Sequence, residues 1–263
     1  MKFPKFLAIA LVFVLGLASV GRAQDQPAQF IQVVTTTVKS EAVTEYEDFV
    51  KKIVAGANKI GAPQRVFGYQ VILGGPGLTY NFVIPFSKWS ELDTFPIPPE
   101  ILAKAYGEAE AAKILKAGRA SVAHSESAVY RLLRDLSTKP KLFDPPKAFT
   151  LVIRTEIKPE TASGYELYLA KVKAAQEQAP DSPTAIRRVA VQGTASTYVT
   201  AIPFNKHSER DGWPSLDDLL SKAYGPAEAR HLSESSLRSV SKREFVVVAY
   251  RPDLSRPAAG PAK

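Results

Sequence analysis

The sequence predicts an α+β fold in which two tandem βαββαβ units pack sheet to sheet. The main observation is a long internal repeat. KAYGEAEA, which begins at Lys104, returns as KAYGPAEA at Lys222, a spacing of 118 residues. At the same spacing, TYNFVIPFSKWSELD from Thr79 matches TYVTAIPFNKHSERD from Thr197. A period this long exceeds that of solenoid repeats and indicates duplication of a whole domain.

The two copies also match near their ends. FIQVVTTTVKSEAVTEYEDF from Phe30 aligns with FTLVIRTEIKPETASGYELY from Phe149, at a spacing of 119. RDLS from Arg134 aligns with PDLS from Pro252, again at 118. A single one-residue deletion between these blocks reconciles the two spacings, so the duplication covers nearly all of the chain from Phe30 onwards.

Each copy has the pattern strand, helix, strand, strand, helix, strand. Strands are indicated by runs rich in Val and Thr, and the first helix by apolar residues at helical spacing that stop at Gly61. The elements expected in the first copy are a strand at Phe30–Val38, a helix from Tyr46 to Ile60, strands at 65–73 and 79–86, a helical segment around the octet and a last strand at 127–133. The last strand of the second copy is expected at 245–251.

Two helices on one face of a four-stranded antiparallel sheet form a ferredoxin-like unit. Such a unit leaves its other sheet face uncovered, and soluble monomers rarely expose a large apolar face. We therefore expect the two ferredoxin-like units to cover each other's faces as one pseudo-dimeric α/β barrel, with the fused chain a monomer.

The first residues predict a signal peptide. Lys2 and Lys5 precede an apolar run from Phe6 to Val20, and cleavage is expected after Ala23. The run is shorter than the ~20 residues that span a bilayer, so we expect a periplasmic or secreted protein without a membrane span after cleavage. The expected divisions are a signal peptide at 1–23, a first repeat at 27–137, a linker at 138–148, a second repeat at 149–255 and a disordered tail at 256–263.

Composition limits the partners. The chain has no cysteine, so stability must come from burial rather than from disulfides. Loss of the signal peptide would lower the formal charge from +8 to +5, and basic residues are spread among acidic ones without a run of like charge. A nucleic-acid groove needs clustered Lys and Arg, so no nucleic-acid partner is expected.

The segment VIPFSKWSELD, in which a strand runs into Trp89 at the start of a short helix, resembles NIPSNAP-like and antibiotic-monooxygenase-like members of the dimeric α/β-barrel superfamily. The resemblance implies two units whose sheets form one barrel. In the cofactor-independent and haem-degrading monooxygenases of that superfamily, an Asn, a Trp and a His form the site. Only Trp89 matches here, because the first strand carries Thr35 and Thr37 and the second copy has His207 at the Trp position. Monooxygenase activity is therefore not expected.

Strand alternation selects the candidate site residues, because successive side chains face opposite sides of a sheet. If Leu151 and Ile153 face the helices, Arg154 and Glu156 point into the barrel. The full set expected to face inward and bind a ligand is Arg154, Glu156, Arg131, Asn81, Gln70 and Arg188. Charges inside a protein are costly unless they are paired or bound. We expect Arg154 to anchor an anionic or carbonyl group and Glu156 to act as an acceptor or base.

Two function classes remain open at this point. One is a small-molecule binding protein, possibly a cofactor-free enzyme, that uses the inter-sheet cavity. The other is a non-catalytic interaction or structural module whose barrel is filled by side chains. No metal and no cofactor is expected, because His124, His207 and His231 fall at non-matching positions of the repeat and a catalytic zinc needs three protein ligands. Ligand pockets run to ~300 Å³ or more, so the cavity volume separates the two classes.

Overall fold

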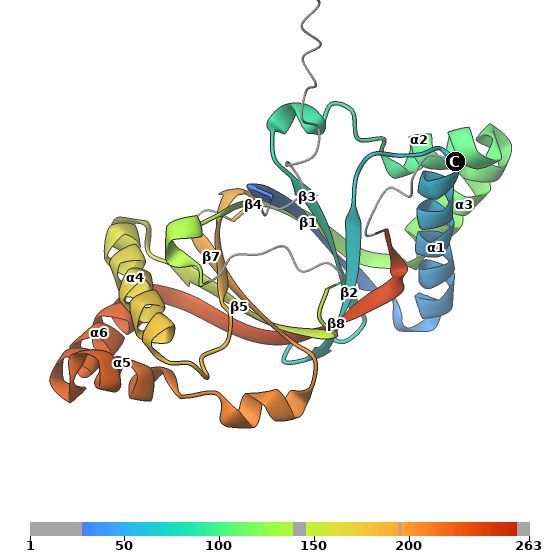
Figure 1. The fold of residues 1–263 in the computed structure, drawn as a ribbon. Helices are drawn as coiled ribbons and strands as arrows, with labels where there is room; N and C mark the ends of the chain where they lie inside the picture. The colour runs from blue at the N-terminus through green and yellow to red at the C-terminus, as the bar shows by residue number, and fades with distance from the viewer. Residues whose placement is uncertain (1–27, 139–145, 195, 257–263) are drawn as a thin grey trace, which may run out of the picture.

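The eight strands form one closed antiparallel barrel (Figure 1). The computed structural model describes residues 28–138, 146–194 and 196–256. The strands of the first unit are β1 (Phe30–Val38), β2 (Val66–Leu73), β3 (Thr79–Phe86) and β4 (Val122–Leu132), and those of the second are β5 (Phe149–Ile157), β6 (Ile186–Gln192), β7 (Thr197–Phe204) and β8 (Val240–Arg256). Around the barrel the order is β1-β3-β2-β8-β5-β7-β6-β4. The predicted fold class is confirmed.

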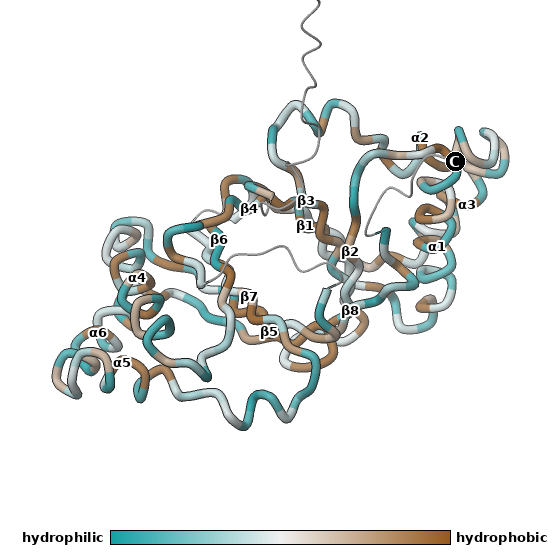
Figure 2. Tube along the Cα trace, in the orientation of Figure 1, coloured by the Kyte–Doolittle hydropathy of each residue, from teal (hydrophilic) through white to brown (hydrophobic). Residues whose placement is uncertain are grey.

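The helices lie outside the barrel in two groups on opposite sides, α1–α3 and α4–α6 (Figure 1). Their bounds are α1 (Val43–Lys59), α2 (Pro98–Tyr106), α3 (Glu108–Ser121), α4 (Ala162–Gln178), α5 (Leu216–Tyr224) and α6 (Pro226–Ser239). Each group covers the outer face of its own unit's sheet. Hydrophobic and hydrophilic residues are mixed along the barrel strands (Figure 2), as expected of antiparallel strands that have helices on one side only.

The repeated octet makes a corner between two helices, where the sequence predicted one helical segment. Gly107 and Gly225 both have φ of +84°, a conformation that L side chains rarely adopt, and each separates two helices. The tyrosine before each glycine is anchored in the same way. The hydroxyl of Tyr106 donates to the carbonyl of Lys52 on α1, and that of Tyr224 donates to the carbonyl of Lys171 on α4. The octet is repeated because both units need this corner.

The two units are joined along two seams, β2–β8 and β4–β6. The repeated DLS segment lies at both. The Gly68 amide of the first unit donates to Ser255 Oγ of the second at 2.8 Å, and the Arg187 amide of the second unit donates to Ser137 Oγ of the first at 2.8 Å. Each serine hydroxyl in turn donates to a carbonyl of its own unit, Arg251 or Leu133. The seams are therefore equivalent, and each is closed by the last residues of a repeat.

Each unit also contributes a leucine to the other unit's core. Leu254 is fully buried with Tyr46 and Tyr80 of the first unit, and Leu136 packs against the core of the second. The backbones approach closely at Gly68, where an added Cβ would lie 2.9 Å from the Leu254 carbonyl oxygen. Neither helix-covered core is complete without residues from the other unit.

Two predicted boundaries need correction. Arg256 was expected to begin a disordered tail, but it ends β8 and is buried, because its guanidinium donates to Asn58 Oδ1 and the Gln64 carbonyl. Thr138 was expected in the linker, but it is buried and hydrogen-bonded to Ala185. The predicted signal peptide, most of the linker and the rest of the tail lie outside the described residues.

Leu254→Ala should destabilise the whole chain, not only the second unit that contains it. Truncating a buried leucine costs about 2–5 kcal/mol, and here the lost contacts belong to the core of the first unit. Thermal unfolding followed separately by near-ultraviolet circular dichroism and by limited proteolysis of each unit should show one transition at a lower temperature. Leu237→Ala, at a leucine that is 64% exposed, is the control and should change little. Two separate transitions would contradict the shared core.

Candidate functional site

The barrel interior is distinct from the helix-covered face of the same strands. On β1, Thr36 and Val38 are buried toward α1, whereas Val33 and Thr35 face inward and stay partly accessible. On β5, Thr155 and Ile157 are buried, and Arg154 and Glu156 face inward and are likewise partly accessible. The inward face therefore lines a lumen that mixes valines such as Val33 and Val199 with polar and charged side chains.

Arg154 is the centre of a charged cluster that joins the two units. Its Nη1 lies 3.7 Å from Glu126 Oε1 of β4, and its Nη2 lies 3.7 Å from Glu156 Oε1 and 3.3 Å from Thr194 Oγ1. Its Nε is buried without a hydrogen-bond partner among the described residues. A cavity of about 70 Å³ adjoins this cluster, lined by Val33, Thr35, Glu126, Ser127, Ala128, Tyr130, Arg154, Gly193 and Thr194.

Asn81 and Arg188 face inward as predicted. Asn81 Oδ1 accepts a 2.8 Å hydrogen bond from Thr35 Oγ1. Val199 of β7 pairs with Arg188 of β6 on one side and with Arg154 of β5 on the other. The three side chains therefore point to the same side of the sheet. Burial lowers the pKa of Arg188 to about 10, and the nearby Tyr69 opposes this shift. The lumen thus holds two arginines from the second unit.

Gln70 was predicted to face inward, and this is wrong. Its Oε1 accepts from Arg251 Nη1 at 2.9 Å on the α1 side of the sheet. The residue of the first unit that is equivalent to Arg188 is Tyr69. Tyr69 pairs with Asn81, and Arg188 pairs with Val199, which is the residue that matches Asn81 in the repeat. The one-residue deletion therefore falls in the hairpin turn after β2, which shifts the alternation of β2 by one position.

Arg131 was also predicted to face inward, and this too is wrong. It lies opposite Phe30 of β1, whose side chain is outside the barrel against Phe86. Its neighbour Tyr130 faces inward instead and lines the cavity. The prediction started β4 at Ser127, five residues late, and so lacked the length of alternation that fixes the register.

Several further lumen residues were not predicted. Glu126 faces inward on β4, and its equivalent Glu244 faces inward on β8, where it pairs with Lys242 at 2.8 Å. Their spacing of 118 within the repeat was the available signal. Tyr69 and Tyr250 also face inward, with ring centroids 5.6 Å apart.

Outside the barrel, a second charged cluster connects the units structurally. Glu47 of α1 accepts from Tyr80 at 2.8 Å and from Arg251 of β8 at 2.6 Å and 2.8 Å. The Arg251 hydrogen bond is the main reason that the pKa of Glu47 lies below its ordinary value. The second unit repeats the tyrosine contact, with Tyr198 donating to Glu166 at 2.8 Å. This cluster is fully paired and stabilises the β2–β8 seam.

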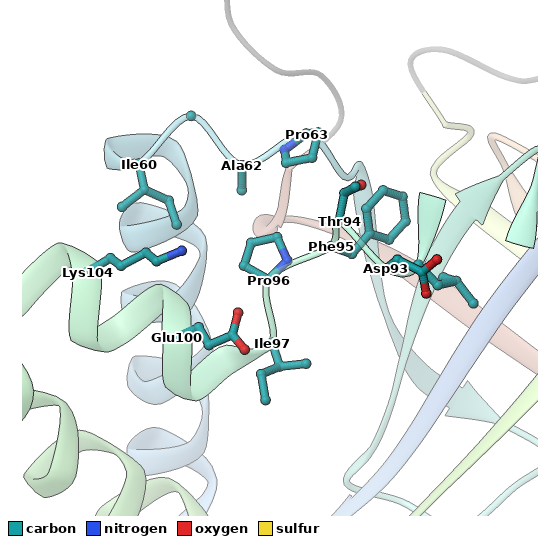
Figure 3. Close-up of a pocket in the computed structure, with 12 residues that line it drawn as sticks. Ile60, Ala62, Pro63, Asp93, Thr94, Phe95, Pro96, Ile97, Glu100 and Lys104 are labelled. Atoms are coloured by element: carbon teal, nitrogen blue, oxygen red, sulfur yellow. The ribbon is translucent and has the colours of Figure 1, made fainter. Parts of the chain in front are cut away.

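A larger pocket of about 560 Å³ lies on the outside of the first unit, between the end of α1 and the start of α2 (Figure 3). Its walls include Ile60, Pro63, Phe95 and Pro96, with Glu100 and Lys104 of α2 at one side. This volume lies within the range of ordinary ligand pockets. No prediction from the sequence pointed to it.

Comparisons with known proteins support the architecture. No protein-family model matches the chain, and no curated protein matches it in sequence. A putative monooxygenase from Lactobacillus acidophilus NCFM matches in structure, with a TM-score of 0.52 and 12% identity over 89% of this chain and 97% of its own. A mutant chlorite dismutase from Candidatus Nitrospira defluvii has a TM-score of 0.52 and 8% identity, over 87% of this chain and 94% of its own. The chain has the dimeric α/β-barrel fold. At these identities the likeness establishes the fold alone.

Within this dimeric α/β barrel, the one residue that matched the monooxygenase pattern is structural. Trp89 lies outside the lumen and packs on Phe30 and Phe86, with 43% of its surface exposed. His207 makes the equivalent contacts with Phe149 and Phe204 in the second unit. Among the described residues, no three His, Cys, Asp or Glu side chains are grouped closely enough to hold a metal ion. In that same part of the chain, every helix is too short or too polar to cross a membrane.

Glu47→Gln should make the stability of the protein less dependent on pH in the acid range. The pKa of Glu47 is lowered in the folded state from 4.5, so its contribution is present above that value and is lost as the pH falls below it. Urea unfolding at a series of pH values between 3 and 7 measures this. The variant should be less stable at neutral pH and should lose less on acidification. Glu234→Gln, on the exposed surface of α6, is the control, and an unchanged pH profile for Glu47→Gln would refute the assignment.

Proposed function

We propose that the protein binds a small molecule inside the barrel, at the cluster around Arg154. The observation that carries this proposal is the inward-facing Arg154 beside a cavity, with its carboxylate neighbours at 3.7 Å and no described residue within hydrogen-bond reach of its Nε. Neither carboxylate is at hydrogen-bond distance, so the guanidinium keeps donors available for a ligand. Thr35 and Thr194 add hydroxyl groups to the same cavity.

The size of the cavity limits the ligand. A volume of about 70 Å³ is far below the ~300 Å³ of a pocket for a drug-sized molecule, and it suits a few water molecules or a group of similar size. We therefore propose a ligand of only a few heavy atoms, or the polar end of a longer one. The similar structures described as a putative monooxygenase and a chlorite dismutase are named for reactions of small molecules, which agrees with this choice.

The proposed location is the periplasm or the cell exterior, because of the predicted signal peptide. Catalysis is not part of the proposal. Glu126 and Glu156 are placed to accept hydrogen bonds from a ligand, and no group in the described lumen is arranged as a nucleophile with its base.

A second candidate function rests on the outer pocket. A ligand of ordinary metabolite size fits the 560 Å³ between α1 and α2 and does not fit the lumen. If the outer pocket were the binding site, the barrel would be a filled scaffold. Lys104→Ala would then abolish binding, and lumen variants would retain it.

Arg154→Ala should abolish ligand retention and leave the fold intact. Native mass spectrometry of the purified protein, compared with its mass under denaturing conditions, detects a retained ligand, and far-ultraviolet circular dichroism reports the fold. Arg131→Ala is the matched control, because Arg131 is exposed and outside the barrel. Retention at the wild-type level by Arg154→Ala would exclude the lumen site, and global unfolding of this variant would show that Arg154 is structural.

A further inference from the structure

Arg187 and Arg188 are adjacent in the sequence, and their side chains lie on opposite faces of β6. Arg187 points to α4, where its Nη2 donates to Gln176 Oε1 at 2.7 Å and its Nη1 donates to the Leu136 carbonyl. Arg188 points into the lumen. Its side chain forms no hydrogen bond or ion pair with any described residue, and its Nε is buried. In the part of the chain that the structure describes, Arg187 has protein acceptors and Arg188 has none.

Among the described residues, the surroundings of Arg188 add hydrogen-bond donors and no negatively charged acceptor. Tyr69 is close enough to Arg188 to affect the pKa of its guanidinium. The ring of Tyr69 in turn lies beside that of Tyr250. Burial raises the pKa of Tyr69 above its ordinary value, so its hydroxyl keeps its proton and can donate. Neither hydroxyl donates to a described residue. This end of the lumen therefore presents a guanidinium and two phenol groups, all of them donors.

The duplication shows that this arrangement is specific to one unit. The position of Arg188 is held by Tyr69 in the first unit, and the position of Arg154 is held by Thr35. Folding does not need a charge at these sites, because the first unit forms the same strands without one. Burying an arginine where no carboxylate of the described residues contacts it is unfavourable unless something negative binds there.

We propose that the Arg188 end of the lumen binds a small oxyanion or carboxylate, held by the Arg188 guanidinium and the hydroxyls of Tyr69 and Tyr250. This inference rests on the proposed function and names the chemical class of its ligand. Arginine suits such a group because its planar donors match two oxygens of a carboxylate or of an inorganic oxyanion. The Glu126 and Glu156 carboxylates beside Arg154 would repel a negatively charged group of the ligand. That group is therefore placed at the Arg188 end of the lumen.

The test uses the full mature chain and measures its melting temperature with formate, acetate, nitrate and phosphate, each at constant ionic strength. At least one anion should raise the melting temperature of the wild type with increasing concentration, by about 5–11 °C at a hundred times its dissociation constant. Arg188→Met should lose this response. Without added anion the variant should melt at or above the wild-type temperature, because it lacks the unpaired charge.

The controls separate this inference from the proposed function. Arg131→Met should respond to the anion as the wild type does. Arg187→Met should melt at a lower temperature without any anion, because it loses a partnered arginine. If Arg188→Met fails to fold, Arg188→Gln keeps a polar side chain and serves in its place. An equal response of wild type and Arg188 variants, or no response to any anion, overturns the inference. A neutral or cationic ligand lost in Arg154→Ala would overturn it too and leave the proposed function standing.

Discussion

The last strand of each unit is shared between the two sheets of the barrel, and the rest of the structure depends on this sharing. β8 pairs with β5 of its own unit and then with β2 of the other, and β4 pairs with β1 and then with β6. The leucine and serine of each repeated DLS segment, at the end of β8 and just after β4, contact the opposite unit. A ferredoxin-like sheet has two free edges, and free edges invite association with other chains. Here each edge is closed by the fused partner, so one chain forms a barrel without edges.

Closure of the barrel also creates its lumen, and fusion lets the lumen be asymmetric. In a symmetric homodimer every inward residue appears twice, related by the twofold axis. An arginine at the position of Arg154 or Arg188 would then be duplicated, and four positive charges would share the interior. In the fused chain the equivalent positions are Thr35 and Tyr69, so only two arginines enter. Fusion therefore permits a single charged site in a fold whose packing remains nearly twofold.

The repeat in the sequence was enough to predict the architecture, because each repeated segment has a structural task in both units: the octet at the helix corner and DLS at the seam. The inward direction of Arg154, Glu156, Asn81 and Arg188 followed from alternation within well-delimited strands. The prediction for Gln70 was wrong because the alignment alone did not place the deleted residue in the turn after β2. The prediction for Arg131 was wrong because β4 begins earlier than predicted. The partners of Arg154 could not be predicted, since Glu126 reaches it from the other unit across the closed barrel.

The central claim is that the two units form one cooperative structure through equivalent seams, and native-state hydrogen exchange tests it most directly. The Gly68 and Arg187 amides report the two seams, because each donates to a serine of the opposite unit. If the units complete each other, both amides exchange only through global unfolding, with the same opening free energy as the most protected core amides. Exchange of either amide at a much lower opening free energy, with the cores still protected, would show that a seam opens by itself and would contradict the account.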